Sequence, residues 1–176
     1  MIADLRAVCR FVAIGAVCSV LAGCLADGDG KPAFYQDMAR VDAQVDAAVA
    51  AQMISQYRVN NGLSPVVADK RLTALAADQA RVMARAKTVN ASLAGEQNLD
   101  RRLAGIGEDG VPAAENVSAG YRTLAEAFSG WRESANHNAV MLHPDASRLG
   151  IATAYASGSK HKVFWSLILA GPAPSP

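Results

Sequence analysis

The sequence predicts an α+β fold, a three-layer α-β-α sandwich in which a central antiparallel sheet lies between two layers of helices. Helical periodicity dominates the first half of the chain, and alternation with a period of two replaces it after about residue 148. The last apolar segment, Val163 to Ala170, is apolar on both of its faces. Such a strand belongs inside a sheet that is covered on both sides, and this requirement implies the three layers.

The first predicted helix begins near Met38, because apolar residues recur from there at every fourth position. These positions are Val41, Val45, Val49, Met53 and Tyr57. The helix is expected to end at Asn60-Asn61-Gly62, since asparagine and glycine tolerate the positive φ that closes a helix.

Two further helices are predicted from their capping residues. Asp69 is the expected N-cap of a second helix. The core positions of this helix are Leu72, Leu75, Ala76, Gln79, Ala80 and Met83. Thr123 and Glu126 form a capping box that starts a third helix toward Trp131. The intervening residues, 88–119, show one helical turn around Leu99 to Leu103 and are otherwise expected to be loop.

The predicted strands lie at the end of the chain. Between Leu149 and Ala156, bulky residues alternate with Gly150, Ala152, Ala154 and Ala156. One face of this strand is therefore nearly flat, and a helix can approach it closely. A turn at residues 157–160 leads into the strand that is apolar on both faces.

The first residues are typical of an exported lipoprotein. Arg6 and Arg10 precede an uncharged apolar run that is too short for a transmembrane helix, which needs about 20 residues. The run closes with Leu21-Ala22-Gly23-Cys24, which matches the bacterial lipobox. We therefore expect a signal peptide at 1–23, acylation of Cys24, a tether at 24–37, a domain at 38–171 and a flexible tail at 172–176. The alternative is an ordinary signal peptide with an incidental cysteine.

Composition narrows the classes of partner. The leader holds two of the 17 basic and one of the 16 acidic residues, so the rest of the chain has 15 of each. A domain without a basic surplus lacks the charge that nucleic acid binding requires. The expected partners are the membrane, through the lipid on Cys24, and a small apolar ligand or an envelope protein.

Four segments, in order, resemble the bacterial branch of the CAP superfamily of cysteine-rich secretory, antigen 5 and pathogenesis-related proteins. The segments are Tyr57-Arg58 with Gly62-Leu63-Ser64-Pro65, Ala114-Glu115-Asn116-Val117 with Gly120, Trp131 with Ser134 and His137, and Leu149-Gly150-Ile151-Ala152 with Phe164-Trp165. The resemblance implies an α-β-α sandwich and an exported protein. Because Leu25 replaces the aspartate that usually retains lipoproteins in the inner membrane, the outer membrane is favoured.

In the family, two histidines and two acidic residues line a cleft that holds a divalent metal in some members. The resemblance places Glu115 at the first acidic position, Ser134 at the second and His137 at the second histidine. The first histidine would fall at Ala91, which has no metal-ligating side chain. Zinc usually takes about four ligands, at least three of them from protein. No cofactor is therefore expected, with zinc as the disfavoured alternative.

Three functions remain open from the sequence. The favoured one is a non-enzymatic module whose cleft, edged by Glu115, Ser134 and His137, binds an apolar or lipid ligand or a protein partner. The second is a hydrolase or metal-dependent enzyme that uses Glu115 and His137. The third is a structural scaffold of the envelope. Glu115 and His137 are expected to form a hydrogen-bonded pair, Ser134 and His137 to share one helix, Trp131 and Trp165 to lie in the core, and His143 and His161 to be solvated.

Overall fold

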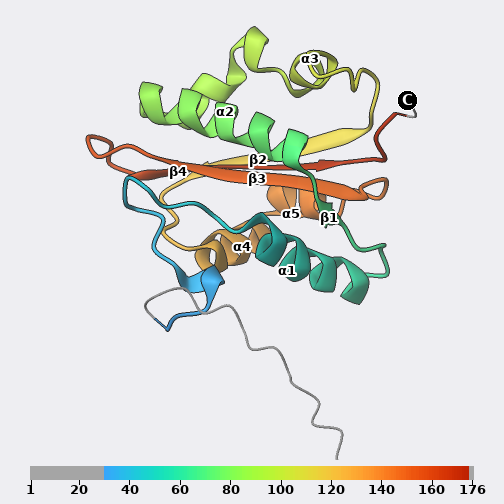
Figure 1. Cartoon of the computed structure of the whole chain (residues 1–176), viewed down its shortest axis with the longest axis horizontal. Helices are drawn as coiled ribbons and strands as arrows, with labels where there is room; N and C mark the ends of the chain where they lie inside the picture. The colour runs from blue at the N-terminus through green and yellow to red at the C-terminus, as the bar shows by residue number, and fades with distance from the viewer. Residues whose placement is uncertain (1–29, 175–176) are drawn as a thin grey trace, which may run out of the picture.

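The computed structural model describes residues 30–174 and has three layers (Figure 1). A four-stranded sheet lies in the middle, with α2 and α3 over one face and α1, α4 and α5 over the other. The helices are α1 (Ala47–Asn60), α2 (Lys70–Ala86), α3 (Leu99–Ala104), α4 (Leu124–Glu133) and α5 (Ala135–Met141), with short 3-10 turns η1 (Ala33–Tyr35), η2 (Val89–Leu93) and η3 (Gly95–Gln97). The predicted α-β-α sandwich is confirmed. The predicted signal peptide and Cys24 lie outside the described residues.

The strands are β1 (Val67–Ala68), β2 (Ala113–Ala119), β3 (Arg148–Tyr155) and β4 (Val163–Ala170), in the order β1-β3-β4-β2. β4 runs antiparallel to both β3 and β2, and all eight of its residues are buried, as expected of a strand that is apolar on both faces. The expected antiparallel sheet has one exception, because β1 pairs with β3 in parallel over two residues.

The flat face of β3 lies directly under α2. A Cβ atom at Gly150 would stand 2.1 Å from the backbone carbon of Leu72, far closer than atoms can approach without a shift. Ala152, on the same face, packs with Leu72 and Ala76 of the helix. The alternation of small and bulky residues in this strand therefore sets how closely helix and sheet approach.

The first helix begins later than the periodicity predicts. α1 starts at Ala47, where the Asp46 carboxylate accepts hydrogen bonds from the backbone N–H groups of Ala48 and Val49. Val41, assigned from the pattern to the buried stripe, is 80% exposed. The expected start near Met38 was wrong, because an N-cap stabilises a helix end wherever its side chain reaches the free N–H groups.

The capping predictions for the other helices are confirmed. Asp69 accepts hydrogen bonds from the N–H groups of Arg71 and Leu72 at the start of α2. The Thr123 hydroxyl accepts one from the N–H of Glu126, whose carboxylate accepts one from the N–H of Arg122. By contrast, β2 lies within the segment that was expected to be loop, so that expectation was wrong for Ala113–Ala119.

The core beneath the sheet contains both tryptophans, as predicted. Trp131 and Trp165 are fully buried and meet edge to face with ring centroids 6.0 Å apart. Each indole N–H has a partner: Trp131 donates to the Ser118 hydroxyl and Trp165 to the Tyr121 carbonyl. Within residues 30–174, no helix combines the length and the apolar character needed to cross a bilayer.

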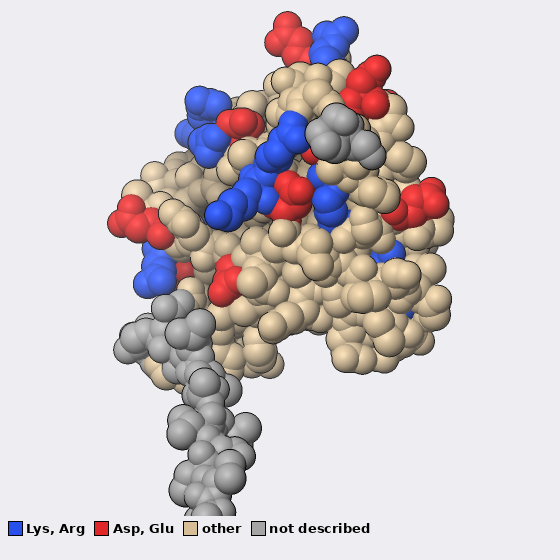
Figure 2. Space-filling view, turned by 45° about the vertical axis from the view of Figure 1, so that its right-hand side comes forward, with Lys and Arg blue, Asp and Glu red and all other residues tan. Residues whose placement is uncertain are grey.

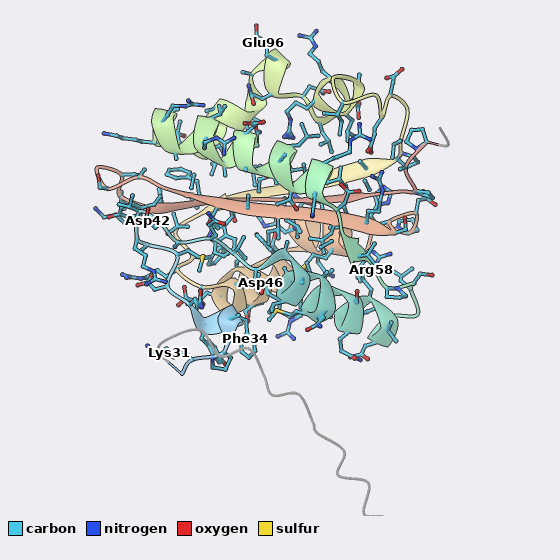
Figure 3. The ribbon with its side chains drawn as sticks, viewed as in Figure 1. Lys31, Phe34, Asp42, Asp46, Arg58 and Glu96 are labelled. Carbon is cyan, nitrogen blue, oxygen red and sulfur yellow. The ribbon has the colours of Figure 1, made fainter. Side chains whose placement is uncertain are left out.

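Arg58 joins α1 to the loops at one end of the core (Figure 3). The side chain is fully buried, and its guanidinium donates hydrogen bonds to four carbonyls, those of Ser64, Met141, His143 and Ala146. Burial lowers the pKa of Arg58. The arginine of the Tyr57-Arg58 motif thus stabilises the chain turns that follow α1 and α5.

Candidate functional site

The candidate site is centred on β2, whose side chains alternate between the two faces of the sheet. Glu115 and Val117 face the layer of α2 and α3, and Asn116 and Ser118 face the layer of α4 and α5. As the outer strand of the sheet, β2 pairs only with β4. Side chains from both helical layers therefore meet it.

Arg102 and Ser166 occupy both oxygens of the Glu115 carboxylate. The Arg102 guanidinium, on α3, donates to Oε2 at 2.6 Å and to Oε1 at 3.3 Å. The Ser166 hydroxyl, on β4, donates to Oε1 at 2.6 Å. The Arg102 and Glu115 side chains are only 9% and 11% exposed. The hydrogen-bonded partner of Glu115 is thus Arg102 rather than His137.

Burial has the largest effect on the Glu115 carboxyl. It raises the pKa of Glu115 above the ordinary value, because a desolvated carboxylate is less stable than one in water. The positive charge of Arg102 and the hydrogen bonds from Ser166 and Arg102 oppose the rise but do not cancel it. Glu115 is thus a buried carboxyl paired with Arg102.

A small hollow lies beside Glu115, over the outer strand. Its volume is about 330 Å³, and its walls are Ser92, Leu93, Ala94, Gly95, Gln97, Asn98, Leu99, Glu115 and Val117. The η2 turn contains Ala91, where the family resemblance places the first histidine, and the adjacent Ser92 lines the hollow. The structure thus brings this position and Glu115 to the same side of the sheet.

His137 lies in the opposite layer. It is part of α5, and its backbone carbonyl accepts a hydrogen bond of 2.9 Å from the Asn116 side chain. The expected hydrogen-bonded pair of Glu115 and His137 was wrong, because consecutive residues of a strand point to opposite faces and Asn116 is the one directed at α5. Glu115 therefore faces α3, and the main chain of His137 lies on the α5 side of the sheet.

Ser134 marks a break between two helices. Its ψ of 119° is extended, so α4 ends before it and α5 begins after it. Its hydroxyl makes no capping hydrogen bond. The expectation that Ser134 and His137 share one helical face was wrong, because the helix is interrupted at the serine.

These residues do not fit a divalent metal. Glu115 already has partners on both oxygens, Ala91 offers no donor atom, and His137 belongs to the other layer. Among residues 30–174, no group of three or more His, Cys, Asp or Glu side chains is arranged to hold an ion.

The two remaining histidines differ in their exposure to solvent. His161 is exposed at the turn between β3 and β4, as expected. His143 is half-buried rather than solvated, because its carbonyl is one of the four that bind Arg58. Arg102 is a structural residue that the sequence did not indicate, and Arg58 was noted there only as part of a family motif. For Arg102, the only local signal was its position in the short helical turn expected near Leu99.

The comparisons with known proteins agree with the architecture. The family model described as the cysteine-rich secretory protein family matches residues 51–169. No curated protein sequence matches the chain. Among solved structures, an outer surface protein of Borrelia burgdorferi has a TM-score of 0.61 at 15% identity, over 73% of this chain and 97% of that one.

Two other solved structures are similar over part of their length. An extracellular protein of Bacillus anthracis with an SCP domain has a TM-score of 0.58 at 20% identity, over 70% of this chain and 39% of that one. A cysteine-rich secretory protein of Staphylococcus aureus has a TM-score of 0.55 at 16% identity, over 76% and 41%. This chain thus spans about two fifths of these two proteins, and the likeness to all three is one of fold.

Proposed function

Since the chain belongs to the cysteine-rich secretory protein family, we propose that it is an exported, lipid-anchored module of a bacterial envelope that binds a partner without catalysing a reaction. The observation that carries the non-enzymatic part is the engagement of Glu115. Its two oxygens are held by Arg102 and Ser166, so the acid that the family places in its cleft is not free to act as a base.

The separation of Glu115 from His137 supports the same proposal. General acid-base catalysis needs a group within hydrogen-bond reach of the proton that it moves, with a second group to orient it. Here the acid faces α3 and the histidine lies on α5, on opposite sides of the sheet. A hydrolase or a metal-dependent enzyme would require a different arrangement of these residues.

The hollow beside Glu115 is the proposed binding cleft. With about 330 Å³ it lies at the small end of the range of about 300 to 1,000 Å³ that is usual for ligand pockets. Leu93 on its rim is 80% exposed, and Leu99 and Val117 add further apolar surface. We propose an apolar or lipid ligand, or an apolar side chain of an envelope protein, as the occupant.

Metal titration tests the non-enzymatic part. We expect zinc to leave the unfolding temperature of the purified protein unchanged, and His137→Ala to behave in the same way as the control His161→Ala. Tight zinc binding that His137→Ala abolishes and His161→Ala preserves would overturn the proposal in favour of a metal-dependent enzyme.

Lipid binding tests the cleft. Extracted envelope lipids should bind saturably, and Leu93→Trp should weaken this binding, since the larger ring covers the mouth of the hollow. Val59→Trp is the matched control, because Val59 is 51% exposed on α1, away from the hollow. Equal binding by both variants would assign the lipids to another surface, and no saturable binding would favour the scaffold.

The proposed anchor has its own test. Mass spectrometry of native material should find an amino-terminal Cys24 that carries acyl chains, and Cys24→Ser should move the protein from the membrane fraction to the soluble fraction. An unmodified thiol in membrane-associated protein would contradict the anchor while leaving the binding module untouched.

A further inference from the structure

The outer edge of β3 is unpaired over most of its length. β1 covers only Arg148 and Leu149, so Ile151 to Tyr155 have no strand beside them among the described residues. The N–H of Asp69 donates to the carbonyl of Leu149, which shows that Leu149 directs its backbone groups away from β4. Because backbone groups alternate along a strand, those of Ile151, Thr153 and Tyr155 point outward too.

The hydrogen bonds between β3 and β4 show independently which residues of β3 point outward. The N–H of Ala156 donates to the carbonyl of Lys162, so the even-numbered residues of β3 are the ones that bond to β4. The outward N–H and C=O groups of Thr153 and Tyr155 lie at partly exposed residues, whereas Ile151 is only 1% exposed. An exposed strand edge of this kind is a template for a further strand.

A groove runs along this edge, and we call it the β3 groove. It consists of two adjoining hollows of about 560 and 470 Å³ that share Arg81, Ala154 and Tyr155. The segment that leads into α1 forms one wall and α2 the other, and Figure 1 shows both beside β3. A strand added to β3 would extend the sheet between these two walls.

The two walls differ in chemistry. The segment before α1 offers Val41, Ala43 and Val45, and Val41 is 80% exposed. The wall from α2 begins with Thr73 and Ala77 and ends in Arg81, Arg85 and Lys87. Since side chains of a strand alternate between faces, an added strand would meet an apolar wall on one side and a basic one on the other.

The basic character of the α2 wall arises only when the fold places the end of α2 beside the connection between β3 and β4. Lys160, His161 and Lys162 form a short basic stretch between β3 and β4 that is too small to indicate a binding site by itself. Ala156, Ser157 and Gly158 of the same connection lie against the end of α2. The Lys87 ammonium lies beside Gly158 of that connection. Of the acidic residues nearby, Asp78 is paired with Arg81, and Asp42 lines the groove near the end of the hairpin (Figure 3). With Arg81 and Asp78 paired, the basic residues Arg85 and Lys87 outnumber the acidic Asp42 along the groove.

We propose that the β3 groove binds an extended segment of a partner protein, with apolar residues on one face and acidic residues on the other, as an added strand of the sheet. Main-chain hydrogen bonds to Thr153 and Tyr155 give the affinity, and the two walls select the side chains. This surface is separate from the hollow beside Glu115, and the inference does not depend on the lipid anchor.

Amide hydrogen exchange provides the sharpest test. The probe is a synthetic peptide of about eight residues, a usual strand length, that alternates valine with glutamate. Binding should slow exchange at Thr153 and Tyr155 and leave Ala152 and Ala154 unchanged, because the even-numbered amides already bond to β4. Uniform protection or none at all would overturn the proposal. So would odd-numbered protection that rises with protein concentration in the absence of peptide, because a second copy would then be the occupant.

Substitutions test the same surface by fluorescence anisotropy. Thr153→Pro removes an outward N–H without removing a ladder hydrogen bond, and should weaken peptide binding by at least about fivefold. Thr153→Val, which keeps the N–H, is the control. The double variant Arg85→Glu/Lys87→Glu should weaken binding about tenfold and serves if the proline variant fails to fold. Equal binding of a valine-lysine peptide, or unchanged binding by either variant, would overturn the proposal.

Discussion

The two faces of the sheet are packed by different means. On the face of α1, α4 and α5, large side chains such as Trp131, Trp165 and Leu167 fill a continuous core. On the face of α2 and α3, Gly150 and Ala152 let the helix backbone approach the strand, and the buried acid Glu115 is paired with an arginine. On the face that Figure 2 shows, charged side chains gather over the upper half, that of α2 and α3, and few lie over the lower half. Packing on the first face therefore depends on side-chain volume. Packing on the second face depends on the close approach of helix and strand and on paired charges.

The largest effect is expected from Arg58, which closes the end of the first face. Arg58→Met should lower the free energy of unfolding by about 4 kcal/mol, since four carbonyls lose a charged donor at one or more kcal/mol each. Urea denaturation measures the change. Arg85→Met, at an exposed site of α2, should change it by less than about 0.5 kcal/mol. Similar losses for both variants would show that the carbonyl contacts contribute little.

Gly150 tests close approach on the second face. Gly150→Ala should cost about 3 kcal/mol, because the new methyl group meets the backbone of Leu72, which cannot rotate away as a side chain could. Gly158→Ala is the matched control, since its nearest neighbour is the flexible end of Lys87. Thermal unfolding of the two variants compares them directly. A stable Gly150→Ala protein would mean that α2 can move outward at little cost.

Substitution of Trp131 tests how far packing on the face of α1, α4 and α5 depends on side-chain volume and on the buried Ser118 hydroxyl. Trp131→Phe should cost about 2 kcal/mol, because it leaves a cavity and removes the donor to the Ser118 hydroxyl. Adding Ser118→Ala should recover part of the loss, since the unpaired hydroxyl is then absent. Strictly additive losses in this double-mutant cycle would argue against the hydrogen bond.

Substitution of Glu115 should have the smallest effect on stability, and the sign of its pH dependence is defined. Its folded-state pKa lies above the ordinary value of 4.5, so its contribution to stability is fully present below that pH and is lost as the pH rises through the folded pKa. Wild type should therefore lose stability relative to Glu115→Gln as the pH is raised from 4 to 8 in urea titrations. Glu133→Gln, at an exposed position on α4, supplies the reference. A difference that grows in favour of wild type would mean that Arg102 outweighs burial.

The elements that could be predicted are those whose signals are local. Asp69 and Thr123 fix the starts of α2 and α4 through contacts within a few residues, and the apolar pattern of β4 reports its burial directly. α1 was extended too far because Val41 and Val45 continue a helical spacing in a segment that is not helical. The periodicity describes which residues meet the core, and Asp46 decides where the helix begins.

β2 and its site could not be found in this way. Glu115, Asn116 and Ser118 are polar on both faces, and alternation of apolar and polar residues is therefore absent. Each polar side chain can be buried because a residue distant in the sequence hydrogen-bonds to it. Glu115 bonds to Arg102, Asn116 to the carbonyl of His137, and Ser118 to the indole of Trp131. The family resemblance selected Glu115 and His137, but strand parity directs Glu115 toward α3 and Asn116 toward the main chain of His137.

The position of β4 has a consequence for how the sheet assembles. Among the described strands, β2 and β3 are joined only through β4, although β4 follows both of them in the sequence. A chain that stops before Val163 holds only the two-residue pairing of β1 with β3, and neither helical layer has a complete surface to cover. Assembly of the sheet must therefore wait until residues 163–170 are available.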